Sequence, residues 1–214
     1  MAKKESTFLN MVITLLVVTA VASFTLASVY NLTKDPIAKA REAAKQQAIS
    51  EVVPEFDNIV TMKFKSIDGP DSLEFSLAYK NNELVGIAVA TYTDAGFSGK
   101  IKAMVGFLPD GTIKDVVHLE HAETPGLGDK IDKTKSDWSN KFQNKNPENG
   151  IKVKKDGGEI DAITAATITS RAYCDAIERA YATFKANLTS ITGEADSSVS
   201  QEENNELATQ NGGE

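Results

Sequence analysis

The chain has 214 residues, enough for one domain of ordinary size with appendages. Its formal charge of −7 is uneven, because six acidic residues and no lysine or arginine follow Gly193, which leaves −1 for the rest. A nearly neutral body argues against nucleic-acid binding. Cys174 is the only cysteine, so the sequence excludes an internal disulfide and a cysteine-ligated cluster.

The first predicted element is a membrane anchor over residues 8–30, which contain no charged side chain. At about 1.5 Å per residue, a helix of this length exceeds a hydrocarbon core of about 30 Å. The alternative is a cleaved signal peptide, with Lys3 and Lys4 before the apolar run and Ala20-Val21-Ala22 as a cleavage site. We favour an uncleaved single transmembrane helix after a tail at 1–7, because the apolar run continues to Tyr30.

Residues 31–60 are predicted to form a helical linker. Asp35 is suited to cap a helix and Pro36 to occupy its first position, and residues rich in Ala, Lys, Glu and Gln follow. Pro54 is expected to end this helix just after Val53. An amphipathic helix lying on the membrane is the alternative, although its apolar face would consist mostly of alanine.

The segment 61–192 is predicted to be an α+β domain. Residues 73–80, 84–92, 100–108 and 112–120 read as strands, with turns at Asn81-Asn82 and Pro109-Asp110-Gly111, which together give antiparallel hairpins. A short helix at 136–142, a last hairpin at 153–163 and an amphipathic helix at 169–188 follow. His118 and His121 are expected on opposite faces of a strand, so no metal site is predicted. The acidic end, 193–214, is predicted to be disordered.

The segment from Asp161 to Ser170 is the most informative part of the chain, because it places Thr164, Thr167 and Thr169 just before the last helix. Free backbone N–H groups and the positive end of the helix dipole converge at such a position and favour a phosphate. The small side chains of Ala165 and Ala166 allow a bulky anion to approach. By spacing alone, a helix N-cap is the alternative.

This segment resembles the flavinylation motif of the FMN-binding domain family, which occurs in Rnf complexes and in sodium-translocating quinone reductases. The family pattern is Asp, two variable residues, Ser or Thr, Gly, Ala, Thr. A second stretch, His121 to Lys130, resembles the family's Glu-Thr-Pro-Gly-Leu-Gly loop, and Lys135-Ser136-Asp137-Trp138 follows it as in G subunits of Rnf. Gly96 to Ile101 is similar to the family's glycine-rich strand entry, and the resemblance covers about residues 70–190.

The resemblance implies that FMN is attached to Thr167 through a phosphoester bond. It implies neither a catalytic residue nor a metal ligand. The further cofactor contacts that it implies lie in the two motifs: Asp161, Thr164, Ala165, Ala166, Glu123, Thr124, Gly126, Leu127 and Gly128. Ala165 stands where the family usually has glycine. Alanine costs little there if φ is negative and more if φ is positive. Asp161 is either a recognition residue for the modifying enzyme or a turn residue.

The resemblance also implies a function: the G subunit of an Rnf-type complex that moves electrons between ferredoxin and NAD and couples them to ion transport. Its partners would be other membrane subunits, membrane lipid and a flavin transferase. The FMN domain would lie on the periplasmic side of a bacterial inner membrane. The alternatives are the C subunit of the quinone reductase and a membrane-anchored scaffold protein without a redox role.

Overall fold

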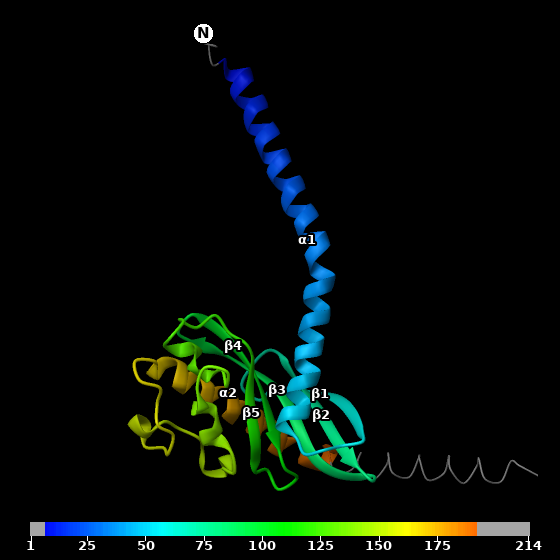
Figure 1. The fold of residues 1–214 in the computed structure, drawn as a ribbon, viewed down its shortest axis with the longest axis vertical. Helices are drawn as coiled ribbons and strands as arrows, with labels where there is room; N and C mark the ends of the chain where they lie inside the picture. The colour runs from blue at the N-terminus through cyan, green and yellow to red at the C-terminus, as the bar shows by residue number, and fades with distance from the viewer. Residues whose placement is uncertain (1–6, 192–214) are drawn as a thin grey trace, which may run out of the picture. The chain divides into compact units, whose positions relative to one another are not determined.

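The computed structural model describes residues 7–191 as two helices and a five-stranded sheet joined by short 3-10 turns (Figure 1). The predicted acidic tail at 193–214 and most of the N-terminal tail lie outside the described residues. In chain order the elements are α1 (Phe8–Val52), β1 (Asn58–Lys65), β2 (Ser72–Lys80), β3 (Glu83–Gly96), β4 (Gly99–Phe107), β5 (Ile113–Glu120), η1 (Gly128–Ile131), η2 (Asp137–Phe142), η3 (Pro147–Asn149), η4 (Lys154–Asp156) and α2 (Thr167–Ala186).

The helix α1 contains the predicted anchor, and within residues 7–191 it is the helix long and apolar enough to cross a membrane. It continues through Pro36, so the predicted helix start at Asp35 is wrong. Proline removes one backbone N–H and crowds the preceding turn, a local cost that the helical residues on both sides overcome. The helix ends at Val52, close to Pro54 as expected. The chain divides after Lys45 into two compact units.

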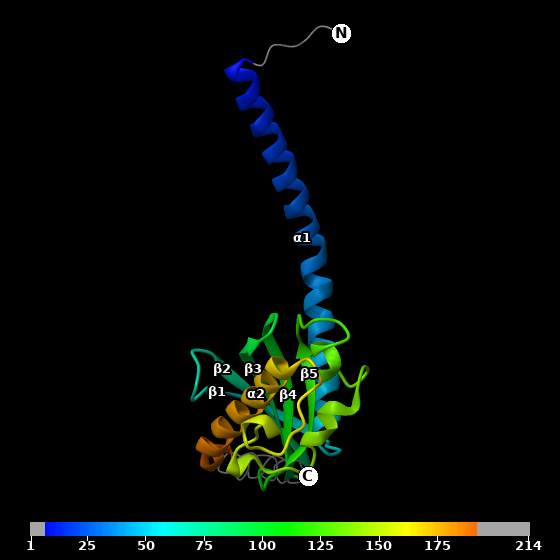
Figure 2. The ribbon, with the colours of Figure 1, turned by 90° about the vertical axis from the view of Figure 1, so that its left-hand side faces the viewer.

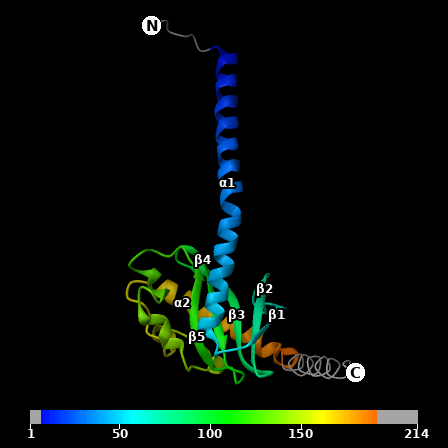
Figure 3. The same ribbon diagram turned by 45° about the vertical axis from the view of Figure 1, so that its right-hand side comes forward.

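The second unit, from Gln46 onward, is built on an antiparallel sheet in the order β1-β2-β3-β4-β5, with each strand beside its sequence neighbours (Figures 2 and 3). The four predicted strands and their hairpins are confirmed. The edge strand β1, which begins inside the predicted linker, was not predicted. It pairs with β2 from Asn58↔Tyr79 to Lys65↔Ser72.

Both faces of the sheet are covered, in accordance with the two-residue period of its strands. On one face, Phe75, Ile87 and Val105 belong to the main core, against which Tyr173 and Ile177 of α2 pack. On the other face, Ala78 and Met104 pack against the last turns of α1, including Ile49 and Val52. A Cβ at position 106 would collide with the carbonyl of Val52, so Gly106 allows this close approach.

The segment 153–163 is not the predicted hairpin. It forms the short turn η4 and one isolated parallel bridge between Val153 and Ile160. Gly157 adopts φ +83°, and a Cβ on Gly158 would collide with the carbonyl of Lys152. The two glycines therefore fold the chain back within a few residues, which leaves too little length for two paired strands. The predicted short helix at 136–142 is the 3-10 turn η2.

Candidate functional site

The predicted flavin acceptor, Thr167, is the first residue of α2 and is partly exposed. Ala166 holds the N-cap position and no side chain caps the helix there, so the alternative that Thr167 is an N-cap residue is wrong. The Lys155 Nζ atom donates a hydrogen bond to Thr167 Oγ1 at 3.1 Å. The hydroxyl therefore lies at the positive end of a helix dipole and beside an ammonium group.

The segment before Thr167 is held by Ser170, one turn into the helix. The buried Ser170 Oγ accepts from the Ile163 N–H and donates to the Ala166 carbonyl, both at 2.9 Å. Thr164 and Ala165 are exposed at the tip of this turn. Ala165 has φ +62°, so alanine occupies a left-handed conformation that glycine adopts without strain.

Asp161 lies at the entrance of the same segment and is neutralised by two lysines. Its carboxylate is 2.8 Å from Lys154 Nζ and 3.7 Å from Lys141 Nζ. The hydrogen bond from Lys154 lowers the pKa of Asp161 below its usual range. The Asp161 carbonyl accepts from Trp138 Nε1 at 2.6 Å. These pairings offset the repulsion that a bare carboxylate would exert on a nearby phosphate.

Glu123 joins the two sequence motifs. Its side chain is only 5% exposed, and its Oε2 atom accepts from the Thr169 hydroxyl of α2 at 2.6 Å. Its Oε1 atom accepts from the backbone N–H of Ser98, in the turn between β3 and β4, at 3.0 Å. One buried carboxylate thus connects the β3–β4 turn, the loop from 123 to 128 and the first turn of α2. Ser98 and Thr169 lie in the motif stretches, but the sequence predicted no contact for them, and it did not single out Lys155, since nothing in the local pattern indicates these contacts.

The loop from 123 to 128 closes on itself. The Thr124 carbonyl accepts from Leu127 N at 3.2 Å and from Asp129 N at 3.4 Å. Gly126 has φ +78° with open space where a Cβ would lie, and its N–H binds the Asp129 carboxylate and lowers the pKa of that group. The loop backbone comes closest to other side chains at Gly128, where a Cβ would lie 2.7 Å from Glu123 Oε2 and 2.8 Å from Thr169 Oγ1.

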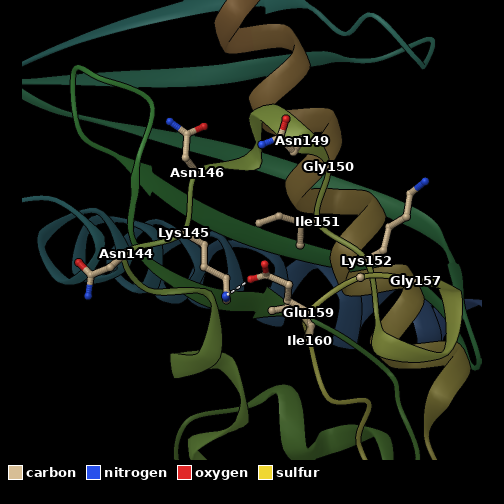
Figure 4. A pocket seen from close by; sticks show the side chains of 11 residues that line it. Asn144, Lys145, Asn146, Asn149, Gly150, Ile151, Lys152, Gly157, Glu159 and Ile160 are labelled. Carbon is tan, nitrogen blue, oxygen red and sulfur yellow. Dashed lines mark hydrogen bonds and ion pairs between the residues drawn. The ribbon is translucent and has the colours of Figure 1, made fainter.

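Two other features lie apart from these motifs. A cavity of about 410 Å³ is lined by asparagines, glycines and the Lys145–Glu159 ion pair, and none of the predicted cofactor contacts lines it (Figure 4). The Cys174 thiol is buried, which raises its pKa to about 12 and makes it inert.

The prediction that His118 and His121 face opposite ways is wrong, because their ring centroids are 5.1 Å apart. The β4–β5 register shifts between Lys102 and Ala103, and β5 ends at Glu120, so strand alternation does not extend to His121. Among residues 7–191, no group of three histidine, cysteine or acidic side chains is arranged to hold a metal ion.

Comparisons with known proteins identify the family of this chain. The family described as the FMN-binding domain matches residues 96–182, and the RnfG N-terminal region matches residues 1–52. Three curated relatives are named as the G subunit of an ion-translocating oxidoreductase complex. They come from Shewanella piezotolerans (36% identity, 72% of this chain and 78% of the relative), Vibrio atlanticus (35%, 77% and 85%) and Aliivibrio fischeri strain ES114 (37%, 80% and 86%).

These matches confirm the predicted cofactor, FMN, and the predicted role as an electron-carrying subunit of a membrane complex. They favour an Rnf G subunit over the C subunit of a quinone reductase and over a scaffold without a redox role. The matched N-terminal region contains the apolar part of α1, which supports a membrane anchor. The chain belongs to the family of G subunits of ion-translocating oxidoreductase complexes.

Proposed function

We propose that Thr167 carries FMN through a phosphoester bond and that this subunit relays electrons within an Rnf-type complex between ferredoxin and NAD. The observation that supports the linkage most directly is the placement of the Thr167 hydroxyl. It is partly exposed, it begins α2, and the Lys155 ammonium lies 3.1 Å away. A phosphate esterified there would gain the α2 N–H groups, the helix dipole and one cation.

The surrounding residues fit this group. Thr164 and Ala165 leave the approach to Thr167 open, and the lysines around Asp161 cancel its charge. Glu123 holds the loop from 123 to 128 against α2, which keeps that loop beside the attachment point. When bound, FMN supplies reversible uptake of one or two electrons, and the protein positions it and tunes its surroundings.

We further propose that the FMN domain lies on the periplasmic side of the inner membrane, where a covalent bond prevents loss of the cofactor. Attachment requires phosphoryl transfer, and the sequence contains no phosphate-binding loop of the nucleotide-binding type. A separate flavin transferase that uses FAD is therefore the expected partner. A C-terminal fusion to a reporter active only outside the cytoplasm should be active, and activity of a cytoplasm-only reporter would contradict this topology.

The test of the linkage is flavin fluorescence of the denatured full-length chain in a gel, after expression with a flavin transferase. Thr167→Ala should abolish the fluorescence while the melting temperature stays close to that of wild type, because the side chain is partly exposed. Thr164→Ala should reduce the labelling without abolishing it. Equal fluorescence from Thr167→Ala and wild type would reject Thr167 as the acceptor.

Lys155→Met gives a second arm of the same experiment. Removing the ammonium group should slow labelling of Thr167, because the phosphate loses its neighbouring cation. Lys185→Met is the matched control, since Lys185 lies in the last turn of α2 and pairs with Glu148. Equal labelling rates for the two variants would show that Lys155 does not assist the attachment.

A further inference from the structure

Two histidines, His118 and His121, form a half-buried pair beside the loop from 123 to 128. Their ring centroids are 5.1 Å apart, with an angle of 64° between the ring planes. His118 Nε2 lies 3.9 Å from an oxygen of Asp132, and the side chains of His118 and Asp132 are 28% and 17% exposed. The pair is therefore shielded in part but remains within reach of protons from water.

His121 is joined directly to this loop. Its Nδ1 atom accepts a hydrogen bond from the Glu123 N–H at 3.2 Å. A ring nitrogen that accepts carries no proton, so neutral His121 is protonated at Nε2, and a second proton would bind at Nδ1 and displace the Glu123 N–H. The Glu123 carboxylate accepts from Thr169 of α2 at 2.6 Å. His121 is thus linked through one residue to the first turn of α2.

Charged side chains from several segments surround the pair: Glu51 of α1, Asp129 of η1, Asp132, and Lys135, whose Nζ lies 3.3 Å from Asp129. The carboxylates at 129 and 132 act on His121, and those at 51 and 132 act on His118. Burial lowers the pKa of His118, and a charge on His121 lowers it further. The surroundings therefore favour one proton on the pair, held by His121.

We propose that His121 is a redox-linked proton site, which binds one proton when the flavin is reduced and releases it when the flavin is oxidised. The inference rests on the proposed attachment of FMN at Thr167, close to the loop that Glu123 holds. A flavin that gains two electrons and one proton carries one more negative charge, and an imidazolium ion nearby offsets that charge. The electrons come from and return to electron carriers of the complex, and the histidine proton comes from and returns to bulk water.

The coupling acts in both directions. If a proton on His121 makes the flavin easier to reduce, reduction of the flavin makes His121 bind its proton more tightly by the same factor. An imidazole is suited to this role because it titrates near neutral pH. Reduction should then draw in a proton from water at a residue that is separate from the flavin itself.

The test measures the midpoint potential of the flavin in full-length flavinylated protein in detergent, from about pH 5 to about pH 9. His121→Gln keeps an amide oxygen that can accept from the Glu123 N–H but cannot bind the proton. Its potential should equal that of wild type at the alkaline end, where histidine is neutral in both flavin states. It should fall below wild type by a growing amount as pH falls and histidine becomes charged.

His121→Lys is the complementary variant, because lysine stays charged through most of this range. Its potential should lie above that of wild type at the alkaline end and approach it at the acidic end. His118→Gln should keep the pH-dependent part of the wild-type curve, which assigns the proton to His121. Glu120→Gln is the matched control: it changes the charge by one unit at the neighbouring exposed position, with a side chain that does not titrate near neutral pH. Any shift that it causes should be the same at every pH.

The shape of the difference between His121→Gln and wild type decides the outcome. A difference that vanishes at alkaline pH and grows on acidification supports the proton site. No difference, or one that is equal at every pH, would overturn it and leave His121 as a residue that only positions the loop. Wild-type protein that loses its flavin on denaturation would instead reject the covalent linkage, while the potential of the bound flavin would still test His121.

Discussion

At the scale of single residues, Ala165 has a strained backbone conformation. The sequence left this open, because the strain depends on the sign of φ at that position, and the structure gives φ +62°. A left-handed conformation costs a non-glycine residue about 1–2 kcal/mol, partly offset because alanine restricts the unfolded chain by about 0.4–1 kcal/mol more than glycine. The family's glycine would remove the strain at the position next to Ala166 and Thr167.

We therefore expect Ala165→Gly to stabilise the protein by up to about 1 kcal/mol. Thermal or urea unfolding of the full-length chain measures this. Ala162→Gly is the control, because Ala162 is not among the residues with positive φ, and it should destabilise slightly. A lower melting temperature for Ala165→Gly than for wild type would show that the alanine side chain contributes contacts that outweigh its strain.

At the scale of elements, the period-2 runs and the Asn-Asn and Pro-Asp-Gly turns predicted β2 to β5, because adjacent hairpins are local structures. Two elements were not predicted correctly. The strand β1 has the same two-residue alternation of half-buried apolar and exposed polar residues from Val60 to Lys65, so its pattern was present and was overlooked beside the predicted linker. The segment 153–163 has strand-like residues, but Gly157 and Gly158 set a tight reversal that only the three-dimensional contacts reveal.

The strand β5 also contains a group that should make stability depend on pH. Burial lowers the pKa of His118, against the opposing effect of Asp132. Glu51 also raises this pKa and His121 lowers it. Because the folded pKa is below the unfolded value of 6.5, the unfolded chain binds the proton first as pH falls. Stability is therefore complete above pH 6.5 and declines as pH falls through the folded pKa.

The melting temperature of the wild type should accordingly fall on acidification from about pH 7 to about pH 5. His118→Gln should flatten this part of the profile, since it removes the titrating group. A variant profile as steep as that of wild type would assign the dependence to another group. His121→Gln is the comparison variant, because it removes the neighbouring ring and leaves His118 in place, so most of the slope should remain.

At the scale of the whole molecule, the sequence predicted an anchor, a linker and a domain, but it could not show that the end of α1 packs within the second compact unit. Ala48, Ile49, Val52 and Val53 are buried against the sheet face opposite α2. The alanine-rich helix pattern offered no reason to expect this, because burial depends on the facing strands. Likewise, Glu123 was predicted from its motif, while its partners 25 and 46 residues away were not.

This arrangement predicts different results for two truncations. A chain that begins at Gln46 keeps the second core and should fold cooperatively. A chain that begins at Glu55 loses four buried apolar residues, worth on the order of 5 kcal/mol, which approaches the whole stability of a small domain. Circular dichroism melting curves should show a sharp transition for the first and none for the second. Equal melting curves would mean that the helix end contributes little.

The shared carboxylate of Glu123 also constrains which amino-acid substitutions such a chain can accept during evolution. Ser98, Gly128 and Thr169 each depend on the same two oxygen atoms, so a change at one position alters the cost of a change at the others. A side chain at 128 is compatible only with a shorter residue at 123 or 169. These positions, distant along the chain, are thus expected to vary together among relatives and to show strongly non-additive double mutants.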